Sequence, residues 1–390
     1  MRPFQTLLLL TLFFSFGFTS DISQTYRFEG KYGLVVNQNE THWEIKWLTP
    51  KPEKGELIVD GQKETTPSSI AHAVKVPLDT DLEKSIQFGG EHSGLTRLAL
   101  KSSFSRKAYS FNKVDSLFVL GDTHGNFDEV STILKNSGLI NEKLEWTGGT
   151  AHLVFVGDIL DRGDDALRLA WLIYDLEQSA MAKGGNVHLV LGNHEIMVMS
   201  NDIRYISEKE QSIAERHQIG YQKIFDPTMT LIGRWMASKP AVLKIDDAVF
   251  AHGGYILNNT LREINDQVAS YLSQPAFTHL KDKEPDYDGY EASDWEAQKE
   301  YFYGAYSPFW FRGYVRSDTL GSYLDFMLTK TGSKVHIVGH TPQKEITAFY
   351  DGKLIATNVE NPGTEMLLLT KRKRKYIRHR IGIDGDIVAF

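Results

Sequence analysis

The central part of the chain repeats one pattern, in which a short apolar run ends at glycine or histidine and polar residues follow. Runs of this length that are rich in β-branched and aromatic residues are typical of buried strands. Five such runs occur, at residues 117–120, 153–156, 187–191, 248–251 and 335–339. Ligands of α/β sheets bind beyond the carboxyl ends of the strands. We therefore expect the polar residues that follow the five runs to meet at one rim.

Helical patterns lie between some of these runs. Residues 126–136 are expected to form a helix over one sheet face. Residues 164–183 have apolar positions at helical spacing and stop at Gly184 and Gly185, as expected for a surface helix that ends in glycine. Residues 197–234 are expected to be mainly helical. This alternation of strands and helices predicts an α/β domain.

The beginning of the chain has a different pattern. Between residues 21 and 112, short β-rich runs are separated by clusters of Asn, Gly, Pro and Asp, and residues 43–47 alternate between apolar and charged. Strands at this spacing predict a small β-sandwich domain, of which the fibronectin type is an example. No catalytic constellation occurs in this part, so we expect it to serve in packing or presentation.

Residues 1–20 are typical of a secretory signal peptide. Arg2 supplies a positive charge, and residues 7–18 form an apolar stretch that is too short to span a bilayer. Gly17 and Ser20 are both acceptable small residues before a cleavage site, and the pattern does not choose between them. We expect the mature protein to be periplasmic or secreted, without a stable membrane anchor.

The composition excludes several kinds of metal site, membrane anchor and binding partner. The chain has no cysteine, which excludes disulfides, thiolate metal sites, a lipoprotein anchor and a cysteine nucleophile. About 370 residues remain after cleavage, enough for two or more domains. The net charge of −7 argues against nucleic acid as a partner. None of these features indicates an oligomeric state.

Two segments interrupt the regular pattern of the second domain, which we assign to residues 113–390. Residues 258–305 form an insertion, and its charged part at 281–300 predicts a solvated loop, a helical insertion or a rim over the site. The basic run at residues 371–375 lies between apolar runs. It predicts a hairpin or an edge strand protected by charge, with phosphate or surface binding as the alternative.

The polar residues at the predicted rim are oxygen and imidazole donors, which suit hard or borderline divalent metals. They are Asp122, His124, Asp158, Asn193, His252 and His340. Six donors exceed the need of one tetrahedral ion, whereas two ions that share a carboxylate would use them all. Sites with two ions about 3.5–4 Å apart hold a phosphoryl group and its attacking hydroxide. We predict two divalent ions bridged by Asp158, with zinc, manganese and iron as candidates.

Three further residues suit phosphoryl chemistry. His194 follows the ligand Asn193 and can act as general acid toward the leaving oxygen. Asp161 would hold this imidazole through its other ring nitrogen and raise its pKa. Arg162 is suited to bidentate capture of phosphate.

Residues 114–360 resemble the calcineurin-like metallophosphoesterases and, within them, the phosphoprotein phosphatase (PPP) superfamily. The motifs Gly-Asp-x-His-Gly, Gly-Asp-x-Val-Asp-Arg-Gly and Gly-Asn-His-Glu match residues 121–125, 157–163 and 192–195, with Leu160 in place of valine. The resemblance implies a β-sandwich flanked by helices. It also implies a first metal held by Asp122, His124 and Asp158, and a second held by Asp158, Asn193, His252 and His340. By the same resemblance, Asp161 and His194 form an acid pair, and Arg162 and Arg312 bind phosphate.

The chain departs from the eukaryotic PPP subunits, because their Ser-Ala-Pro-Asn-Tyr motif is absent. Pro342 also removes the second histidine of the Gly-His-x-His pair found in other metallophosphoesterases. With the leader, these features are similar to the Shewanella-like protein phosphatase branch, which includes an exported cold-active protein-tyrosine phosphatase. This resemblance implies phosphotyrosine as a substrate. Aromatic residues between 301 and 314 surround Arg312 and predict either walls for a phosphorylated phenol or a domain core.

The leading hypothesis is a metal-dependent phosphoprotein phosphatase that hydrolyses phosphomonoesters by direct attack of metal-bound hydroxide, with phosphotyrosine favoured. Its partner would be a phosphoprotein or phosphopeptide. The alternatives are a serine/threonine phosphatase, a dinucleoside-tetraphosphate hydrolase, which shares these motifs, and a surface-binding module with a vestigial metal site. The expected export argues against the nucleotide substrate, and the complete donor set argues against a vestigial site.

Overall fold

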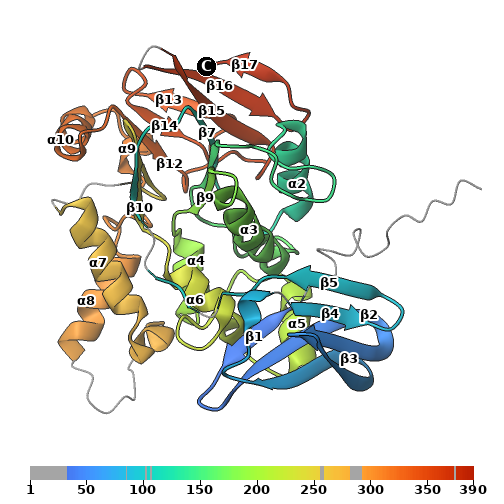
Figure 1. Cartoon of the computed structure of the whole chain (residues 1–390). Coiled ribbons are helices and arrows are strands. Elements are labelled where there is room, and N and C mark those ends of the chain that lie inside the picture. The colour runs from blue at the N-terminus through green and yellow to red at the C-terminus, as the bar shows by residue number, and fades with distance from the viewer. Residues whose placement is uncertain are drawn as a thin grey trace, which may run out of the picture.

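Two six-stranded sheets form the centre of the protein, and a separate five-stranded sheet lies at one end (Figure 1). The computed structural model describes residues 33–390 except 85, 102, 106–107, 255–258, 282–291 and 373–374. The first central sheet has the strand order β17-β16-β15-β7-β8-β9, and the second has the order β13-β14-β12-β11-β10-β6. This arrangement confirms the predicted β-sandwich with flanking helices.

In the first central sheet, parallel strands are followed by an antiparallel hairpin. The parallel strands are β7 (Ser116–Leu120), β8 (His152–Phe155) and β9 (Asn186–Leu189). The antiparallel strands are β15 (Glu365–Arg372), β16 (Lys375–Gly382) and β17 (Ile387–Ala389). The basic run therefore lies at the β15–β16 hairpin, which confirms the predicted hairpin.

The second central sheet is also mixed. Its strands are β6 (Ser110–Phe111), β10 (Val242–Ile245), β11 (Ala248–Ala251), β12 (Val335–Val338), β13 (Thr347–Phe349) and β14 (Leu354–Ala356). Strands β11, β12 and β14 are parallel, whereas β10 and β13 run antiparallel to their neighbours β11 and β14. Strand β6 pairs with β10, so the last residues assigned by sequence to the first domain belong to the central sandwich.

The inner strands of the two central sheets are continuously apolar because both of their faces are covered. In β8, Val154 faces the core between the two sheets, whereas Leu153 and Phe155 face the core under the helices. The alternation of side chains along a strand places successive residues in these two cores. The short apolar runs in the sequence therefore indicate a sandwich covered on both outer faces.

Helices follow the parallel strands as predicted. Residues 126–136 contain α2 (Phe127–Asn136), and residues 164–183 contain α3 (Ala166–Met181). The mixed segment 197–234 contains the end of α4 (Asn193–Met199), all of α5 (Glu208–His217) and η2 (Tyr221–Phe225), and the start of α6 (Leu231–Ala237). Helices α9 (Gly313–Arg316) and α10 (Gly321–Thr331) precede β12.

The predicted insertion is helical where the structure describes it. It contains α7 (Leu261–Leu272), η3 (Pro275–His279) and α8 (Ala292–Tyr303), which lie together beside the sandwich (Figure 1). The hydroxyl of Tyr303 lies 2.6 Å from the Ser200 hydroxyl, directly after α4. This contact connects the insertion to the end of helix α4, which follows β9. Part of its charged segment, 282–291, is outside the described residues, so a rim over the site stays a prediction.

The N-terminal domain is one curled sheet, not the predicted β-sandwich. It consists of β1 (Val35–Gln38), β2 (His42–Val59), β3 (Gln62–Pro77), β4 (Ile86–Gly90) and β5 (Gly94–Leu98), with η1 (Leu82–Lys84) before β4. Strand β2 continues through Pro50 and Pro52, where its pairing with β3 shifts register. Its first half pairs with β1 and its second half with β4.

Curling lets a single sheet enclose its own core. Trp47, from the first half of β2, is fully buried and donates from Nε1 to the carbonyl oxygen of Gly89 at 2.8 Å. Its ring centroid lies 6.4 Å from that of Phe88 on β4. A bulged strand that bends through a right-handed twist makes this closure possible. One long strand therefore takes the place of two strands in separate sheets.

The curled sheet is docked on the helices of the sandwich. Trp171 of α3 donates from Nε1 to the carbonyl oxygen of Leu34 at 3.0 Å. The carbonyl oxygen of Gly33 lies 2.5 Å from Nε2 of His217 on α5. Arg234 of α6 donates to the side-chain oxygen of Gln38. Three helices thus fix the position of β1.

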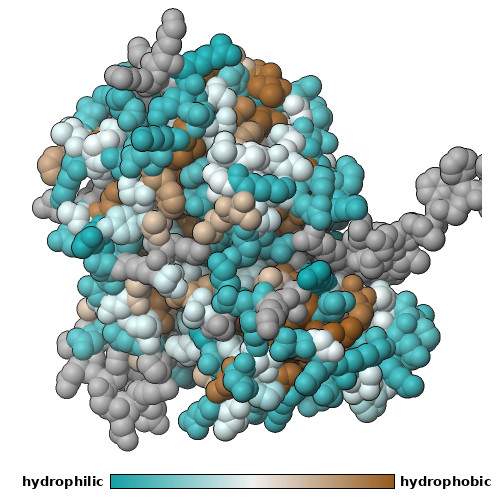
Figure 2. Space-filling view, viewed as in Figure 1, coloured by the Kyte–Doolittle hydropathy of each residue, from teal (hydrophilic) through white to brown (hydrophobic). Residues whose placement is uncertain are grey.

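Hydrophilic residues cover most of the surface in the view of Figure 2, and an apolar area lies at the edge strand β17. Ile387 and Val388 of this strand are exposed. Among the residues that the structure describes, no helix has the length and apolar character needed to cross a bilayer. The predicted signal peptide lies outside these residues, so export remains a prediction.

A buried carboxyl on α5 makes the fold sensitive to pH. Glu210 accepts hydrogen bonds from the Leu167 N–H and the Tyr221 hydroxyl. Burial raises its pKa to about 8, although the Tyr221 hydrogen bond opposes the shift. The unfolded chain releases this proton near its ordinary pKa, whereas the folded chain keeps it. Stability must therefore fall as pH rises from about 4.5 to about 8.

We predict that Glu210→Gln, which imitates the neutral acid, removes this contribution. Between pH 5 and 8 the wild type should lose stability relative to the variant, by at most about 1.4 kcal/mol per pH unit. Urea unfolding at several pH values measures the difference, with exposed Glu208→Gln on the same helix as the control. Parallel stability curves for the wild type and Glu210→Gln would contradict the prediction.

Candidate dimetal site

The strand ends that carry the predicted donors converge, but they come from two sheets and not from one. Asp122 follows β7 and His340 follows β12, yet the His340 N–H donates to Asp122 Oδ1 at 2.9 Å. His252 follows β11, and its Nδ1 lies 2.6 Å from the carbonyl oxygen of Val156, at the end of β8. The predicted rim is therefore the edge where the carboxyl ends of both central sheets meet.

Asp158 lies at the centre of this edge and is shared by two groups of possible metal ligands. One group contains His124, Asp158 and His194, and the other contains Asp158, His252 and His340. Within each group the ligand atoms lie within 4.8 Å of one another. All of these side chains are buried. A carboxylate common to two donor groups is the arrangement that two neighbouring ions need.

The other two predicted donors complete the groups. Asp122 Oδ2 lies 3.8 Å from His124 Nε2, and Asn193 Oδ1 lies 3.0 Å from His252 Nε2. The structure thus brings all six predicted donors together. His194 is also within reach of Asp158, with 3.9 Å between Nε2 and Oδ2, although it was not predicted as a ligand.

Unusual backbone conformations orient these side chains toward one another. His124, Asp158 and His340 have φ values of 44°, 52° and 62°, in the left-handed region that non-glycine residues rarely adopt. Such conformations cost on the order of 1–3 kcal/mol each and persist where the surroundings impose them. Gly192 supplies part of this constraint, because a Cβ at that position would lie 2.3 Å from Asp158 Oδ1. The glycine of the third motif is therefore required by the close approach of Asp158.

The histidine rings turn Nε2 toward the donor groups. A carbonyl oxygen can only accept, so Nδ1 of His252 donates to Val156 and Nδ1 of His124 donates to Leu160. The Nε2 atoms are then directed inward. Nε2 of His124 and of His340 is buried without a hydrogen-bond partner in the described part of the chain. Buried nitrogen atoms of this kind need a partner, and a metal ion fits them.

The electrostatics of the site also favour the binding of cations. Burial, together with the neighbouring Asp158, raises the pKa of Asp122 to about 7. Burial alone would lower the pKa of His252, but Asp158 and Asp122 raise it to about 9. Its Nε2 lies 3.0 Å from Asp158 Oδ2 and 3.0 Å from Asn193 Oδ1. The protonated ring supplies the positive charge that these two buried oxygens need, and a metal ion between them would do the same.

Two histidines are held neutral and can therefore coordinate a metal. Burial lowers the pKa of His124 to about 4 and that of His340 to about 2, with His252 adding to the shift of His340. Neutral imidazole with carboxylate and amide oxygens is a donor set that suits zinc, iron and manganese. The residues present thus fit two divalent ions.

His194 and Asp161 form the predicted pair beside the donors. Nδ1 of His194 lies 2.6 Å from Asp161 Oδ2, and both side chains are buried. Burial opposes the charged form of His194, but the charge of Asp158 and the bond to Asp161 raise its pKa above the ordinary value. Because Nδ1 is held by Asp161, the Nε2 side of the ring is presented to the donor groups.

The two predicted phosphate-binding arginines lie at different histidines. Arg162 is exposed, and its Nη2 lies 3.1 Å from Nε2 of His194. Arg312 is half-buried and donates from Nη1 to the carbonyl oxygen of His340. Burial lowers the pKa of Arg312, with Asp122 and Asp158 acting in the opposite direction. Both guanidinium groups are therefore next to the donor groups.

The predicted aromatic cluster divides between core and site. Its buried members belong to the hydrophobic core; they are Phe302, Phe309, Phe311 and Tyr314. Tyr306 is 66% exposed. Trp310, in contrast, lies with its ring centroid 5.6 Å from that of His340. The core interpretation holds for most of the cluster, and Trp310 is the member placed at the site.

Three residues at the site were not given roles from the sequence. Glu195 is buried and accepts hydrogen bonds from the N–H groups of Asp158, Ile159 and Gly192. Asn358 donates to Asp122 Oδ2 at 2.6 Å, and the Tyr205 ring centroid lies 5.5 Å from that of His194. Glu195 belongs to the third motif, and Asn358 follows the apolar run of β14. Tyr205 has no comparable signal.

Comparison with known proteins agrees with this geometry. A family model described as calcineurin-like phosphoesterase matches residues 116–344, which contain all six donors. Among relatives, Shewanella-like protein phosphatase 2 of Arabidopsis thaliana is 27% identical over 42% of this chain and 53% of its own length. Shewanella-like protein phosphatase 1 of Plasmodium berghei is 28% identical over 43% and 46%. The chain thus spans about half the length of these two relatives.

A solved structure covers more of the chain. The crystal structure of a cold-active protein-tyrosine phosphatase of a psychrophilic Shewanella species superimposes with a TM-score of 0.71. It is 25% identical and covers 91% of this chain, and 97% of its own chain is matched. The likeness therefore includes the N-terminal sheet as well as the central sandwich.

We predict that the purified protein binds about two divalent ions per chain. Asp158→Asn should weaken both ions because it removes the shared charge, whereas His340→Ala should remove about one. Mass spectrometry of the metals retained after dialysis measures the stoichiometry, and circular dichroism verifies folding. Asp128→Asn, whose side chain is 86% exposed, is the control. Unchanged metal content in folded Asp158→Asn would contradict the shared-carboxylate arrangement.

Proposed function

This chain belongs to the calcineurin-like phosphoesterase family, and from that premise we propose that it is a dimetal phosphoprotein phosphatase that prefers phosphotyrosine. The observation that carries the proposal is the position of Asp158, shared by two donor groups. The hydrogen-bonded pair of His194 and Asp161 lies beside it. This arrangement combines a place for two cations, a proton donor and nearby guanidinium groups, which are the needs of phosphomonoester hydrolysis.

The donors divide into two sets around Asp158. Asp122 and His124 would hold one ion with it, and Asn193, His252 and His340 would hold the other. When bound, a pair of divalent cations supplies an activated water and neutralises charge on the phosphoryl group. Arg162 and Arg312 would bind the phosphoryl oxygens, because guanidinium groups match their geometry.

His194 would give its proton to the oxygen of the leaving alcohol or phenol. Asp161 keeps the ring oriented and stabilises its protonated form through the bond to Nδ1. The bond between phosphorus and this oxygen breaks as water adds its oxygen and one hydrogen to phosphorus, giving hydrogen phosphate. The other proton of the water is released and restores the protonated form of His194. The chain has no cysteine, so a thiol nucleophile takes no part.

The preference for phosphotyrosine is supported by two aromatic side chains. Tyr205 lies beside His194, and Trp310 lies beside His340. A phenyl ring attached to a phosphate at the donor groups could pack against these rings, which phosphoserine cannot do. The likeness to the solved structure of a cold-active protein-tyrosine phosphatase also supports a preference for phosphotyrosine. We also propose export of the mature protein, which is supported by the signal-peptide pattern of residues 1–20.

We predict that the metal-loaded protein hydrolyses phosphotyrosine peptides with a higher kcat/KM than matched phosphoserine and phosphothreonine peptides. Tyr205→Ala and Trp310→Ala should each reduce kcat/KM on phosphotyrosine by about threefold to tenfold, the range expected for one aromatic contact. Their effect on phosphoserine should be smaller. Exposed Tyr306→Ala is the control. Equal rates on the three peptides would refute the preference, and faster hydrolysis of a dinucleoside tetraphosphate would refute the substrate class.

We predict that His194→Asn lowers kcat by about 10²- to 10⁴-fold, the usual contribution of a general acid, while two ions stay bound. The loss should be smaller with p-nitrophenyl phosphate than with phenyl phosphate, because nitrophenolate needs less help in leaving. Asp161→Asn should show the same dependence on the leaving group. Equal losses on both esters would exclude proton donation by His194, and activity that survives complete removal of metal would exclude the dimetal proposal.

A further inference from the structure

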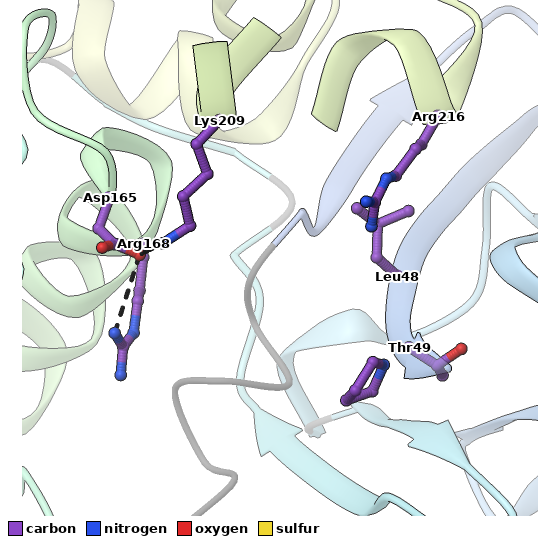
Figure 3. Close-up of a pocket in the computed structure, with 7 residues that line it drawn as sticks. Leu48, Thr49, Asp165, Arg168, Lys209 and Arg216 are labelled. Atoms are coloured by element: carbon purple, nitrogen blue, oxygen red, sulfur yellow. Dashed lines mark hydrogen bonds and ion pairs between the residues drawn. The ribbon is translucent and has the colours of Figure 1, made fainter. Parts of the chain in front are cut away.

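We propose that a basic pocket between the N-terminal sheet and the catalytic domain binds an acidic side chain of the phosphopeptide substrate. The pocket has a volume of about 340 Å³ and lies between the bend of β2 and helices α3 and α5 (Figure 3). It is lined by Leu48, Thr49, Pro50, Asp165, Arg168, Lys209 and Arg216. The inference rests on the proposed function and extends it to the residues around the phosphotyrosine.

The pocket has more positive than negative charge. Among the described residues that line it, Asp165 is the only acidic one, whereas Arg168, Lys209 and Arg216 are cationic. The Asp165 carboxylate is already engaged by Lys209, with 3.0 Å between Oδ1 and Nζ, and lies 3.8 Å from Nη1 of Arg168. Arg216 forms no ion pair with any described residue. Nη1 of Arg168 also lies 4.0 Å from Oδ1 of Asp128, so Arg216 is the cationic lining residue that remains for an incoming anion.

Arg168 is fixed in a position that leaves part of its guanidinium group unsatisfied. Its carbon Cζ lies 3.7 Å from the centroid of the Phe127 ring, so the side chain is held against an aromatic face. Its Nε atom is buried and has no hydrogen-bond partner among the described residues. Buried donors are usually paired, so this Nε–H leaves the guanidinium group incompletely satisfied beside the pocket.

The N-terminal sheet forms the opposite wall. In Figure 3, Arg216 lies above Leu48, while Lys209 and Asp165 meet on the other side of the pocket. Thr49 directs its hydroxyl to carbonyl oxygens of its own sheet, at 3.0 Å from Lys51 and 3.2 Å from Ser69. This wall therefore offers mainly apolar surface, suited to the methylene groups of Glu. The bend that replaces the predicted sandwich creates this wall.

The pocket is within reach of a peptide bound at the donor groups. Asp165 follows Arg162 by three residues, so their Cα atoms lie within about 11 Å. The Asp165 N–H donates to the carbonyl oxygen of Gly125, next to the donor His124, at 3.2 Å. An extended peptide covers this separation in roughly three to five residues. An acidic residue at that spacing from the phosphotyrosine could enter the pocket.

The test uses the metal-loaded, full-length mature protein and a set of phosphotyrosine peptides. Each peptide carries one Glu at a position three to five residues before or after the phosphotyrosine, and its partner carries Gln there. At one or two adjacent positions Glu should raise kcat/KM by about threefold to tenfold through KM, an effect that weakens as salt increases. kcat should stay unchanged, because the pocket does not touch the reacting atoms.

Variants connect this preference to the pocket. Arg216→Ala should abolish the Glu advantage and leave the rate on the Gln peptide unchanged, and Arg216→Glu should favour a peptide with Lys at the same position. Arg372→Ala, which removes an exposed arginine from the β15–β16 hairpin, is the control and should retain the Glu advantage. Retention of the full advantage in both Arg216 variants would overturn the inference.

Two failures can be distinguished. If the wild type hydrolyses all phosphotyrosine peptides at equal rates, the acidic subsite is refuted while the proposed function stands. If it hydrolyses p-nitrophenyl phosphate but none of the peptides, the phosphoprotein substrate is refuted and the subsite with it.

Discussion

Four acidic side chains are buried close together at the centre of this protein, and their charge has to be compensated there. Asp161 is paired with the ring of His194. Glu195 is compensated by backbone N–H groups from the loop after β8 and from Gly192. Asp122 receives hydrogen bonds from Asn358 and from the His340 backbone. Asp158 remains, shared by imidazoles on both sides. Two cations between these groups would complete the compensation, and the ends of both sheets are arranged around that need.

Much of this site could be predicted from the sequence, because each donor directly follows an apolar strand. A strand places its carboxyl end at a fixed edge, so residues far apart in the chain, such as Asp122 and His340, could be assigned to one site. The roles of Asn358 and Tyr205 could not be predicted from the sequence, for physical reasons. An amide that orients a carboxylate and a ring that packs beside an imidazole are recognised from contacts between distant segments, which local pattern does not contain.

The N-terminal domain shows the opposite case. Alternation of apolar and polar residues predicts the strands correctly. The same alternation occurs in two strands of facing sheets and in one long strand that bends, so it does not distinguish these two architectures. Clusters that contain proline predict a break between strands, yet Pro50 and Pro52 lie where β2 shifts register and curls. The packing of Trp47 against Phe88, which closes the curl, cannot be seen from either segment alone. The same bend places Leu48 at the surface shared with the helices that follow the metal-binding loops.

The central claim is that Asp158 joins two metal ions at the meeting edge of the two sheets. A crystal structure of the metal-loaded protein, with anomalous scattering recorded at the absorption edges of manganese, iron and zinc, tests it most directly. The account predicts two anomalous peaks about 3.5–4 Å apart, with one oxygen of Asp158 or both between them. A single peak, or two peaks that leave Asp158 without a metal contact, would contradict it.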